Sequence, residues 1–309
     1  MKKDAIMIFG ATASGKTGLA IALANVLDGV VINADSRQIY KHMPIITAMP
    51  SKEEFDAAPH ELFDFLDPSE AFSVVDYVEK AREVAKRVIK AGKVPVFCGG
   101  TGFYLKALDE GMSPIPDVDA EIVQKMNDSE KEEGIEGLYN ALQIVDPELA
   151  ATLKPADSQR IIRGLAVFEA TGKKLSMFQK QEKQNGLGLK SLKIAINRPR
   201  EETYARIEQR FDMMMDAGLE LEMKQLKEQG YTTDMPALTS LGIPEFYSYL
   251  EGTTSLEDVA EMIKQQTRRY AKRQITWLRH QFGADITLNE ISSESMPELV
   301  QQIEEKFNA

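Results

Sequence analysis

Short apolar runs alternate with longer amphipathic stretches along the first third of the chain. Runs rich in branched apolar side chains at 5–9, 30–33 and 94–98 predict three buried strands, and a later run at 192–197 predicts a fourth. Between them, the stretch 75–92 has apolar residues at helical spacing and ends at a glycine, a typical helix stop. Strands that alternate with helices in this way predict an α/β fold, in which helices cover both faces of a parallel sheet.

The pattern changes after Pro114, where a proline-containing segment leads into an acidic helical stretch. No strand-like run occurs between Arg198 and Phe282, so we expect helical insertions on the α/β core. The expected organisation is a core at 1–116, a helical insertion at 117–150, a continuation of the core at 151–200, a second helical region at 201–280 and a return to the core at 281–309.

The stretch "GATASGKT" joins the first predicted strand to a predicted helix. Backbone amides of such a glycine-rich loop converge on phosphate oxygens, Lys16 neutralises phosphate charge, and Thr17 offers a hydroxyl to Mg²⁺. The alternative is an ordinary strand-to-helix turn, but this pattern seldom arises by chance. The sequence therefore predicts a P-loop NTPase-like core, of a kind common in nucleotide- and ATP-binding proteins, that binds a phosphorylated ligand with Mg²⁺ as cofactor; the loop alone does not say which ligand. Phosphate would bind at Gly10, Ala11, Thr12, Ala13, Ser14, Gly15, Lys16 and Thr17.

Two further polar segments follow predicted strands. In "INADSRQIY", Asp35 stands at a strand end, where it could bind Mg²⁺ through water or accept a proton, unless it caps a following helix. Arg37 and Gln38 in the same segment suit a nucleobase edge. In "CGGTGFYLKAL", the glycines would let backbone approach a ligand and Thr101 adds a hydroxyl, although a packing bend is the alternative. Because ligands bind at the carboxyl ends of parallel strands, we expect all three segments around one crevice.

The charge is unevenly distributed along the chain. With 48 acidic and 37 basic residues the net charge is −11, which argues weakly against a nucleic-acid partner. The segment 267–280 nevertheless holds five basic residues and no acid, as suits a polyanion, although a solvated helix face is the alternative. The single cysteine excludes an intrachain disulfide, the three histidines form no metal-binding pattern, and no apolar run is long enough to span a membrane. We therefore expect a cytoplasmic protein without a membrane partner.

Seven segments occur in one order along the chain: "GATASGKT", "INADSRQIY", "AAPHELFDFLDPSEAFSVVDY", "GGTGFYLKAL", "DSQRIIRGLAVFEATGK", "RIEQRFDMM" and "TRRYAKRQITWLR". Together they resemble the bacterial tRNA dimethylallyltransferases, and the resemblance covers nearly the whole chain. It implies transfer of the dimethylallyl group from dimethylallyl diphosphate to the exocyclic amine of the adenosine 3′-adjacent to the anticodon, with release of diphosphate. The P-loop would then hold the diphosphate of a prenyl donor without phosphoryl transfer.

The resemblance also implies roles for single residues. Asp35 would be the general base, Lys16 would stabilise the leaving diphosphate, and Thr101 would line the channel in which donor and base meet. Arg210 would contact the diphosphate, although pairing with acids on its own helix is the alternative. A helix within 151–200 and the region 201–280 would bind tRNA, unless the former is a plain amphipathic helix. The implied tRNA-binding residues are Asp35, Ser36, Arg37, Gln38, Thr101, Gln159, Arg160, Ile161, Ile162, Arg163, Arg269 and Arg273.

The last basic segment has its own periodicity. Ala271, Ile275, Leu278 and Phe282 recur at helical spacing and predict a core-facing side. This leaves Arg269, Arg273 and His280 on the opposite side for an RNA backbone, and Trp277 is expected to pack with the apolar side.

Five positions depart from the family pattern: Ala11 replaces a usual Pro, Ile46 a Gly, Met49 a Lys, and Ile243 and Pro244 a Tyr and a basic residue. The implied catalytic residues are intact, so we expect activity to survive. A nucleoside or nucleotide kinase is one alternative, but the acidic segment after Pro114 lacks an arginine-rich lid. An RNA-binding protein with an ATP-dependent switch is another.

Overall fold

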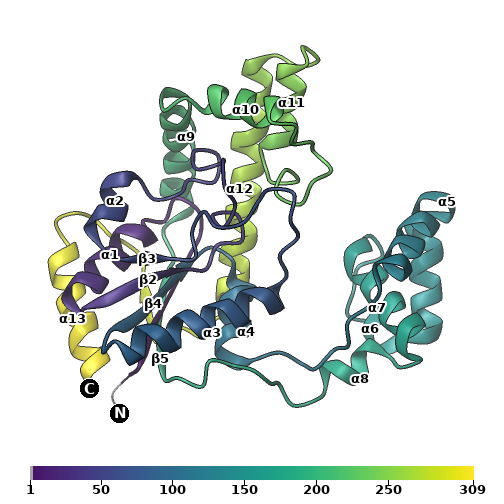
Figure 1. The fold of residues 1–309 in the computed structure, drawn as a ribbon, viewed down its shortest axis with the longest axis horizontal. Helices are drawn as coiled ribbons and strands as arrows, with labels where there is room; N and C mark the ends of the chain where they lie inside the picture. The colour runs from purple at the N-terminus through teal and green to yellow at the C-terminus, as the bar shows by residue number, and fades with distance from the viewer. Residues whose placement is uncertain (1–2) are drawn as a thin grey trace. The chain divides into compact units, whose positions relative to one another are not determined.

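The computed structural model describes residues 3–309 and contains one sheet of six strands in the order β3-β2-β4-β1-β5-β6 (Figure 1). Every neighbouring pair is parallel, which confirms the predicted α/β fold. The strands are β1 Ala5–Gly10, β2 Gly29–Asn33, β3 His60–Glu61, β4 Val94–Gly99, β5 Ser191–Ile196 and β6 Ile286–Leu288. Four of them were predicted. Strands β3 and β6 were not, because such short segments show no periodicity.

Successive residues of the central strand β1 face opposite sides of the sheet, and both sides are buried. Ile6 and Ile8 share a hydrophobic cluster with residues of α1 (Lys16–Val26) and α13 (Met296–Asn308). The other face is covered by α3 (Val74–Lys90), with which α4 (Gly102–Glu110) stacks through the rings of Tyr77 and Tyr104. Helices therefore cover both faces, as predicted.

Four helices lie between β5 and β6 in the chain: α9 Arg200–Asp216, α10 Leu219–Glu228, α11 Ile243–Leu250 and α12 Leu256–Gln281 (Figure 1). They pack with the segment that follows β2, since Ile39 and Met43 share a hydrophobic cluster with Met223 and Phe246. This segment also carries the short helix α2 (Lys52–Ala57). The helical region predicted at 201–280 is thus part of the same compact unit as the sheet.

Helix α12 has the predicted two-sided character. Ala271, Leu278 and Phe282 are buried, whereas Arg269 and Arg273 are exposed. The ring of Trp277 lies 5.1 Å from that of Phe9 on β1, so this tryptophan packs against the sheet, as expected.

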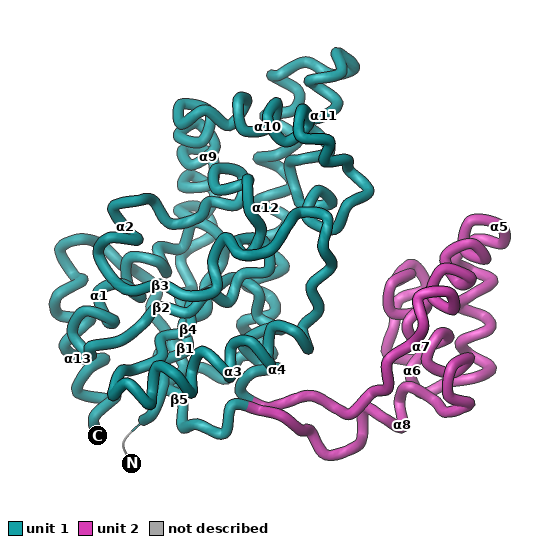
Figure 2. The backbone as a smooth tube through the Cα atoms, in the orientation of Figure 1, with its two compact units in different colours: residues 1–109, 187–309 teal, residues 110–186 magenta. Residues whose placement is uncertain are grey.

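Residues 110–186 form a second compact unit (Figure 2). Its helices are α5 Ala120–Val145, α6 Pro147–Ala150, α7 Ser158–Thr171 and α8 Leu175–Gln179. The sequence placed the insertion at 117–150 and returned to the core at 151, but α7 packs on α5 instead. Gly164 explains this packing, because an added Cβ would lie 2.8 Å from Leu142 and 2.7 Å from Leu149.

The chain leaves and re-enters the first unit at one place. The Leu187 amide donates to the Leu108 carbonyl over 2.6 Å. Within the second unit, Met112 and Gln184 exchange two backbone hydrogen bonds of 2.9 and 2.8 Å. Across residues 3–309, no helix combines the length and apolarity that a bilayer crossing requires.

Candidate active site

A cleft of about 640 Å³ opens at the carboxyl ends of the strands, where the sequence placed its crevice. Half of the predicted site residues of the first unit line it, and Thr12 is the P-loop residue among them. Its lining consists of Thr12, Asp35, Ser36, Arg37, Ile46, Thr47, Ala48, Thr101, Ile207, Arg210, Phe211, Met214, Thr239, Ser240, Leu241, Ile263, Lys264, Gln266, Thr267, Arg269, Tyr270 and Arg273.

The P-loop at one end of this cleft is held by hydrogen bonds from outside. Arg198 donates from Nε to the Ser14 carbonyl, and Arg206 donates from Nε to the Ala13 carbonyl, each over 2.8 Å. Gly15 adopts φ +90° and ends the loop, so that α1 begins at Lys16. The amides of this first helical turn have no acceptor within the helix and are available to an anion.

Two side chains of the loop also fit an anionic ligand. The Ser14 hydroxyl is buried without a hydrogen-bond partner. Lys16 forms no hydrogen bond or ion pair within residues 3–309, and burial lowers its pKa, while the negative charge of Asp35 opposes this shift. An unpaired cation and an unsatisfied buried hydroxyl beside free amides are what a phosphate group would satisfy.

Asp35 is fixed by a local turn. Its Oδ1 accepts from the Arg37 amide over 3.0 Å, and its own amide donates to the side chain of buried Asn33 over 2.8 Å. Asn33 also donates to the carbonyls of Asp35 and Leu62, over 3.1 and 3.0 Å. The next helix, α2, begins only at Lys52, so the alternative that Asp35 caps a helix is wrong. Asp35 lines the cleft, and the turn thus holds one of its two carboxylate oxygens in place.

The loop after β4 is joined to the loop after β2. Thr101 Oγ1 accepts from the Ser36 amide over 2.9 Å and donates to the Ser36 hydroxyl over 3.2 Å. The glycines around Thr101 were expected to admit a ligand, but their close neighbours are protein atoms. A Cβ at Gly100 would lie 2.6 Å from Gln274 Nε2, and one at Gly102 would overlap the ring of Trp277. These close protein neighbours support the packing alternative, and the approach of a ligand to these glycines stays a prediction.

Gln38 supports the cleft wall and does not line it. Its Nε2 donates to the carbonyls of Thr47 and Ala48, over 3.2 and 2.7 Å. The Nε2 group is thus committed to the 46–48 loop, and the predicted contact of Gln38 with a base stays a prediction. Arg37 lines the cleft and donates to the Pro236 carbonyl over 3.4 Å.

The opposite wall of the cleft is apolar and rests on a buried carboxylate. Glu222 accepts from the amides of Ile45 and Ile46 over 2.7 and 2.9 Å, which fixes the loop that presents Ile46 to the cleft. Burial raises the pKa of Glu222 to about 7, against the lowering effect of these two amides. The departure at Ile46 is accommodated by Gly242, whose added Cβ would lie 3.0 Å from the Ile46 side chain.

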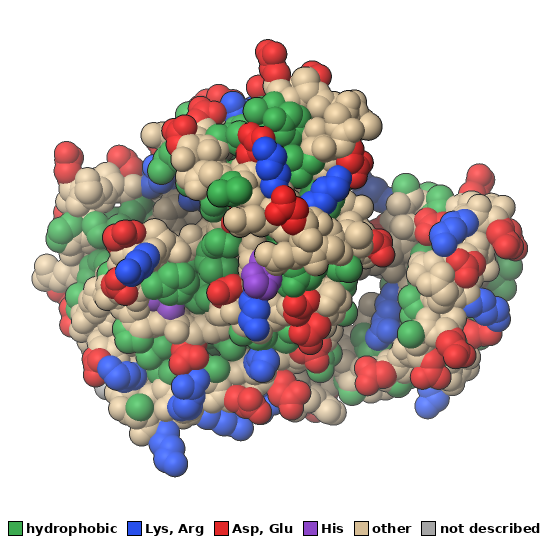
Figure 3. All heavy atoms as spheres, turned by 45° about the horizontal axis from the view of Figure 1, so that its top comes forward, with side chains coloured by type: hydrophobic (Ala, Val, Ile, Leu, Met, Phe, Trp, Pro, Cys, Tyr) green, Lys and Arg blue, Asp and Glu red, His purple; other side chains and the backbone are tan. Residues whose placement is uncertain are grey.

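Basic side chains from α9 and α12 face the same cleft. Arg210, Lys264, Arg269 and Arg273 all line it. Burial lowers the pKa of Arg210, and the charge of Arg206 acts in the same direction. Elsewhere acidic and basic side chains are interspersed, as on the face drawn in Figure 3. Within residues 3–309, no group of three or more His, Cys, Asp or Glu side chains could hold a metal ion without further ligands.

The second unit carries the remaining predicted tRNA-binding residues, all on α7. Gln159 and Arg160 are exposed, and Arg160 pairs with Asp157 over 3.6 Å. Arg163 is half-buried. Ile161 and Ile162 are only 0% and 7% exposed, so their side chains belong to the hydrophobic core of this unit, and binding of tRNA at these two positions stays a prediction.

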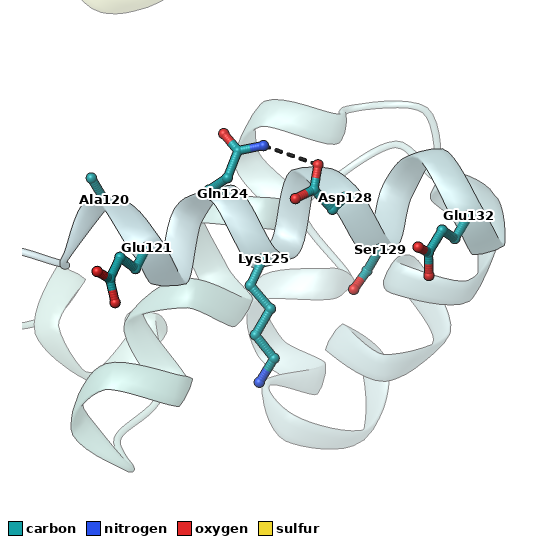
Figure 4. A pocket seen from close by; sticks show the side chains of 7 residues that line it. All are labelled: Ala120, Glu121, Gln124, Lys125, Asp128, Ser129 and Glu132. Atoms are coloured by element: carbon teal, nitrogen blue, oxygen red, sulfur yellow. Dashed lines mark hydrogen bonds between the residues drawn. The ribbon is translucent and has the colours of Figure 1, made fainter.

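A shallow hollow on α5 does not form a comparable site. Figure 4 shows that its seven lining side chains all come from this single helix, and that Gln124 bonds to Asp128. Lys125 is paired with Glu169 on α7. These side chains form a solvated helix face with local partners.

Three residues that shape the cleft were missed by sequence reasoning: Asn33, Glu222 and Gln274. Asn33 gave a weak signal as a polar residue at the end of an apolar strand. The other two gave none, because their partners lie far away in the chain.

Comparisons with known proteins agree with one another. The family model described as IPP transferase matches residues 38–281, and that described as isopentenyl transferase matches residues 3–65. The tRNA dimethylallyltransferase of Syntrophobacter fumaroxidans is 41% identical over 274 residues, 89% of this chain and 80% of the relative. That of Magnetococcus marinus is 42% identical over 278 residues, 89% of this chain and 91% of the relative.

Two solved structures resemble the fold closely. The tRNA isopentenylpyrophosphate transferase of Bacillus halodurans aligns with a TM-score of 0.71 at 32% identity, over 99% of this chain and 97% of that chain. A eukaryotic dimethylallyltransferase acting on tRNA aligns with a TM-score of 0.82 at 29% identity, over 97% of this chain and 78% of that chain.

Proposed function

The chain belongs to the IPP transferase family, and we propose that it is a tRNA dimethylallyltransferase. The reaction transfers the dimethylallyl group of dimethylallyl diphosphate to the exocyclic amine of the adenosine 3′-adjacent to the anticodon, and diphosphate leaves. The observation that carries this proposal is one cleft in which a P-loop, the Asp35 carboxylate and an apolar wall meet.

The P-loop end of the cleft suits the diphosphate. Cleavage of the allylic C–O bond leaves negative charge on the departing diphosphate, and donors that are already in place lower the free energy of that state. Lys16, the amides of the first turn of α1 and the half-buried Arg210 are such donors.

Mg²⁺ fits this end as well. Thr17, in the first turn of α1, would hold the ion through its hydroxyl, next to the loop whose free amides and unpaired Ser14 hydroxyl suit an anion. The bound ion would neutralise charge on the leaving diphosphate.

The carboxylate of Asp35 suits a general base that removes a proton from the adenine amine. As the bond between the adenine nitrogen and the allylic carbon forms, the amine loses a proton, and a carboxylate within reach accepts it. The turn through Arg37 fixes one oxygen of Asp35, and the Thr101–Ser36 pair fixes the neighbouring backbone. The apolar wall with Ile46, Phe211 and Met214 suits the prenyl chain.

The basic side chains of α12 and α7 suit binding of the RNA. A base in a folded anticodon loop must leave its stack to reach a recessed donor. Arg269 and Arg273 on the exposed side of α12 would bind phosphates of the loop. Gln159, Arg160 and Arg163 on α7 are proposed as further RNA contacts from the second unit.

The test is to incubate the protein with Mg²⁺, dimethylallyl diphosphate and an unmodified anticodon stem-loop, followed by mass analysis of the nucleosides. We expect a five-carbon addition on one adenosine, and losses of at least about 100-fold in Asp35→Ala and Lys16→Ala. The exposed Asp56→Ala and Lys52→Ala on α2 are matched controls that should keep full activity. ATP turnover with a nucleoside acceptor and no prenylated RNA would support the kinase alternative. RNA binding without product would support the non-enzymatic alternative.

A further inference from the structure

Gln274 joins three segments that are distant in the sequence. It lies on α12 and is only 5% exposed. Its Oε1 accepts from the Thr12 amide over 2.9 Å, and its Nε2 donates to the Gly100 carbonyl over 2.7 Å. One amide side chain thereby links α12, the P-loop and the loop after β4.

The two hydrogen bonds of Gln274 lie just beyond the point where the pairing of β1 with β4 ends. The ladder between β1 and β4 ends at the pair Phe9 and Gly99. Beyond this pair, one segment leads into the P-loop and the other leads to Thr101. Gln274 bonds to Thr12, three residues after Phe9, and to Gly100, the residue after Gly99, so it connects the two segments beyond the end of the ladder.

A neutral side chain with one donor and one acceptor fits both partners. The Thr12 amide needs an acceptor and the Gly100 carbonyl needs a donor, and the glutamine side chain presents one of each. A carboxylate would lack the donor, and an apolar side chain of the same length would leave the part-buried Thr12 amide and the buried Gly100 carbonyl unpaired. Gly100 permits the close approach, because a Cβ there would lie 2.6 Å from Gln274 Nε2 and 3.1 Å from Asp35 Oδ2.

Both linked loops carry reacting groups, whereas Gln274 itself does not line the cleft. Thr12 belongs to the phosphate-binding loop, and Gly100 lies beside Asp35 and precedes Thr101. Arg273, the residue before Gln274, lines the cleft from α12. The bridge therefore connects the leaving-group side, the base side and the RNA-facing helix.

We propose that Gln274 is a positioning residue that sets the spacing between the diphosphate cradle and the Asp35 side of the cleft. The proposal rests on the proposed function. A displacement of about 1 Å between reacting groups lowers rates by about 100-fold, so the loss should fall on kcat. KM for the stem-loop should change little, because the arginines that face the RNA remain.

The test compares Gln274→Met and Gln274→Glu with Gln265→Met and Gln265→Glu, an exposed glutamine on the same helix. We expect kcat to fall about 100-fold in Gln274→Met at neutral pH, with KM within about threefold. A protonated carboxyl has one donor and one acceptor, like an amide. Relative to wild type, Gln274→Glu should therefore regain activity as the pH falls, whereas Gln274→Met should not. A merely structural residue would give no such recovery.

Hydrogen exchange provides a readout without turnover. We expect faster amide exchange at 10–14 and 99–102 in Gln274→Met and unchanged exchange there in Gln265→Met. Unchanged kcat, or unchanged exchange in both loops, would overturn the proposal. If Gln274→Met fails to fold, Gln274→Asn, which is one methylene shorter, should show the same kcat loss. Absence of product from the wild type would contradict the proposed function instead, and the exchange result would still decide whether Gln274 holds the loops.

Discussion

At the scale of single residues, the cleft is shaped by buried polar side chains that bond to backbone groups. Asn33 holds the turn of Asp35, and Glu222 holds the loop of Ile46. Neither lines the cleft, yet each fixes a residue that does. Loss of such a partner leaves a buried amide or carbonyl unsatisfied, which costs about 1–3 kcal/mol.

Glu222 makes stability depend on pH. Its pKa in the folded protein, about 7, lies above the ordinary value of 4.5, so the folded state binds this proton more tightly than the unfolded chain. The resulting stabilisation is complete below about pH 4.5 and is lost as the pH rises through about 7. Urea unfolding at pH 5 and pH 8 should therefore show a decrease in the free energy of unfolding, roughly 3 kcal/mol at most, that Glu222→Gln lacks.

The exposed Glu228→Gln on the same helix is the control and should retain the full decrease. An equal decrease in wild type and Glu222→Gln would assign the pH dependence to other groups.

At the scale of elements, α12 is positioned by its close approach to α4. Gly102 at the start of α4 faces the ring of Trp277, which also packs against Phe9. We expect Gly102→Ala to lower the free energy of unfolding by about 1–3 kcal/mol, because the methyl group would displace the ring and with it the helix. Thermal unfolding measures this loss.

Gly18 on α1 offers a matched substitution, since a Cβ there meets nothing within 4 Å. Gly18→Ala should leave stability unchanged or raise it by up to about 1 kcal/mol, as expected for an exposed helical position. Equal losses in the two variants would mean that backbone freedom, and not contact with Trp277, decides the effect at Gly102.

The helices, strands and loops also differ in how far they could be predicted from the sequence. The P-loop was predictable because its function depends on adjacent residues, and the four longer strands were predictable from their apolar runs. Strands β3 and β6 were too short to be recognised. Gln274 was predicted only as part of a helix, since its two partners lie 262 and 174 residues away. The boundary of the insertion was missed for the same reason, because it depends on how α7 packs on α5.

At the scale of the whole molecule, a chain of net charge −11 must hold a polyanion. The cations that line the cleft offer local attraction, while the rest of the surface contributes repulsion at long range. Binding of the stem-loop should weaken as salt increases, because each phosphate contact releases counterions.

We expect Arg269→Ala and Arg273→Ala each to reduce the slope of log affinity against log salt concentration by about 0.7–0.9. Fluorescence anisotropy with labelled stem-loop from 50 to 300 mM salt, roughly the range in which such slopes are measured, tests this. The exposed Lys86→Ala on α3 should leave the slope unchanged. An unchanged slope in both arginine variants would place the phosphate contacts elsewhere.

The bond between Leu187 and Leu108 closes the base of the second unit. Within the connectivity of the first unit, the whole segment 110–186 is therefore a long loop whose flanking residues are hydrogen-bonded to each other. The entropy of closing such a loop grows only with the logarithm of its length, so doubling it costs about 0.6 kcal/mol. Homologous chains could gain or lose entire helices here with little effect on the stability of the catalytic unit. The base of this insertion is thus a point at which chain length can change at little cost to the stability of the first unit.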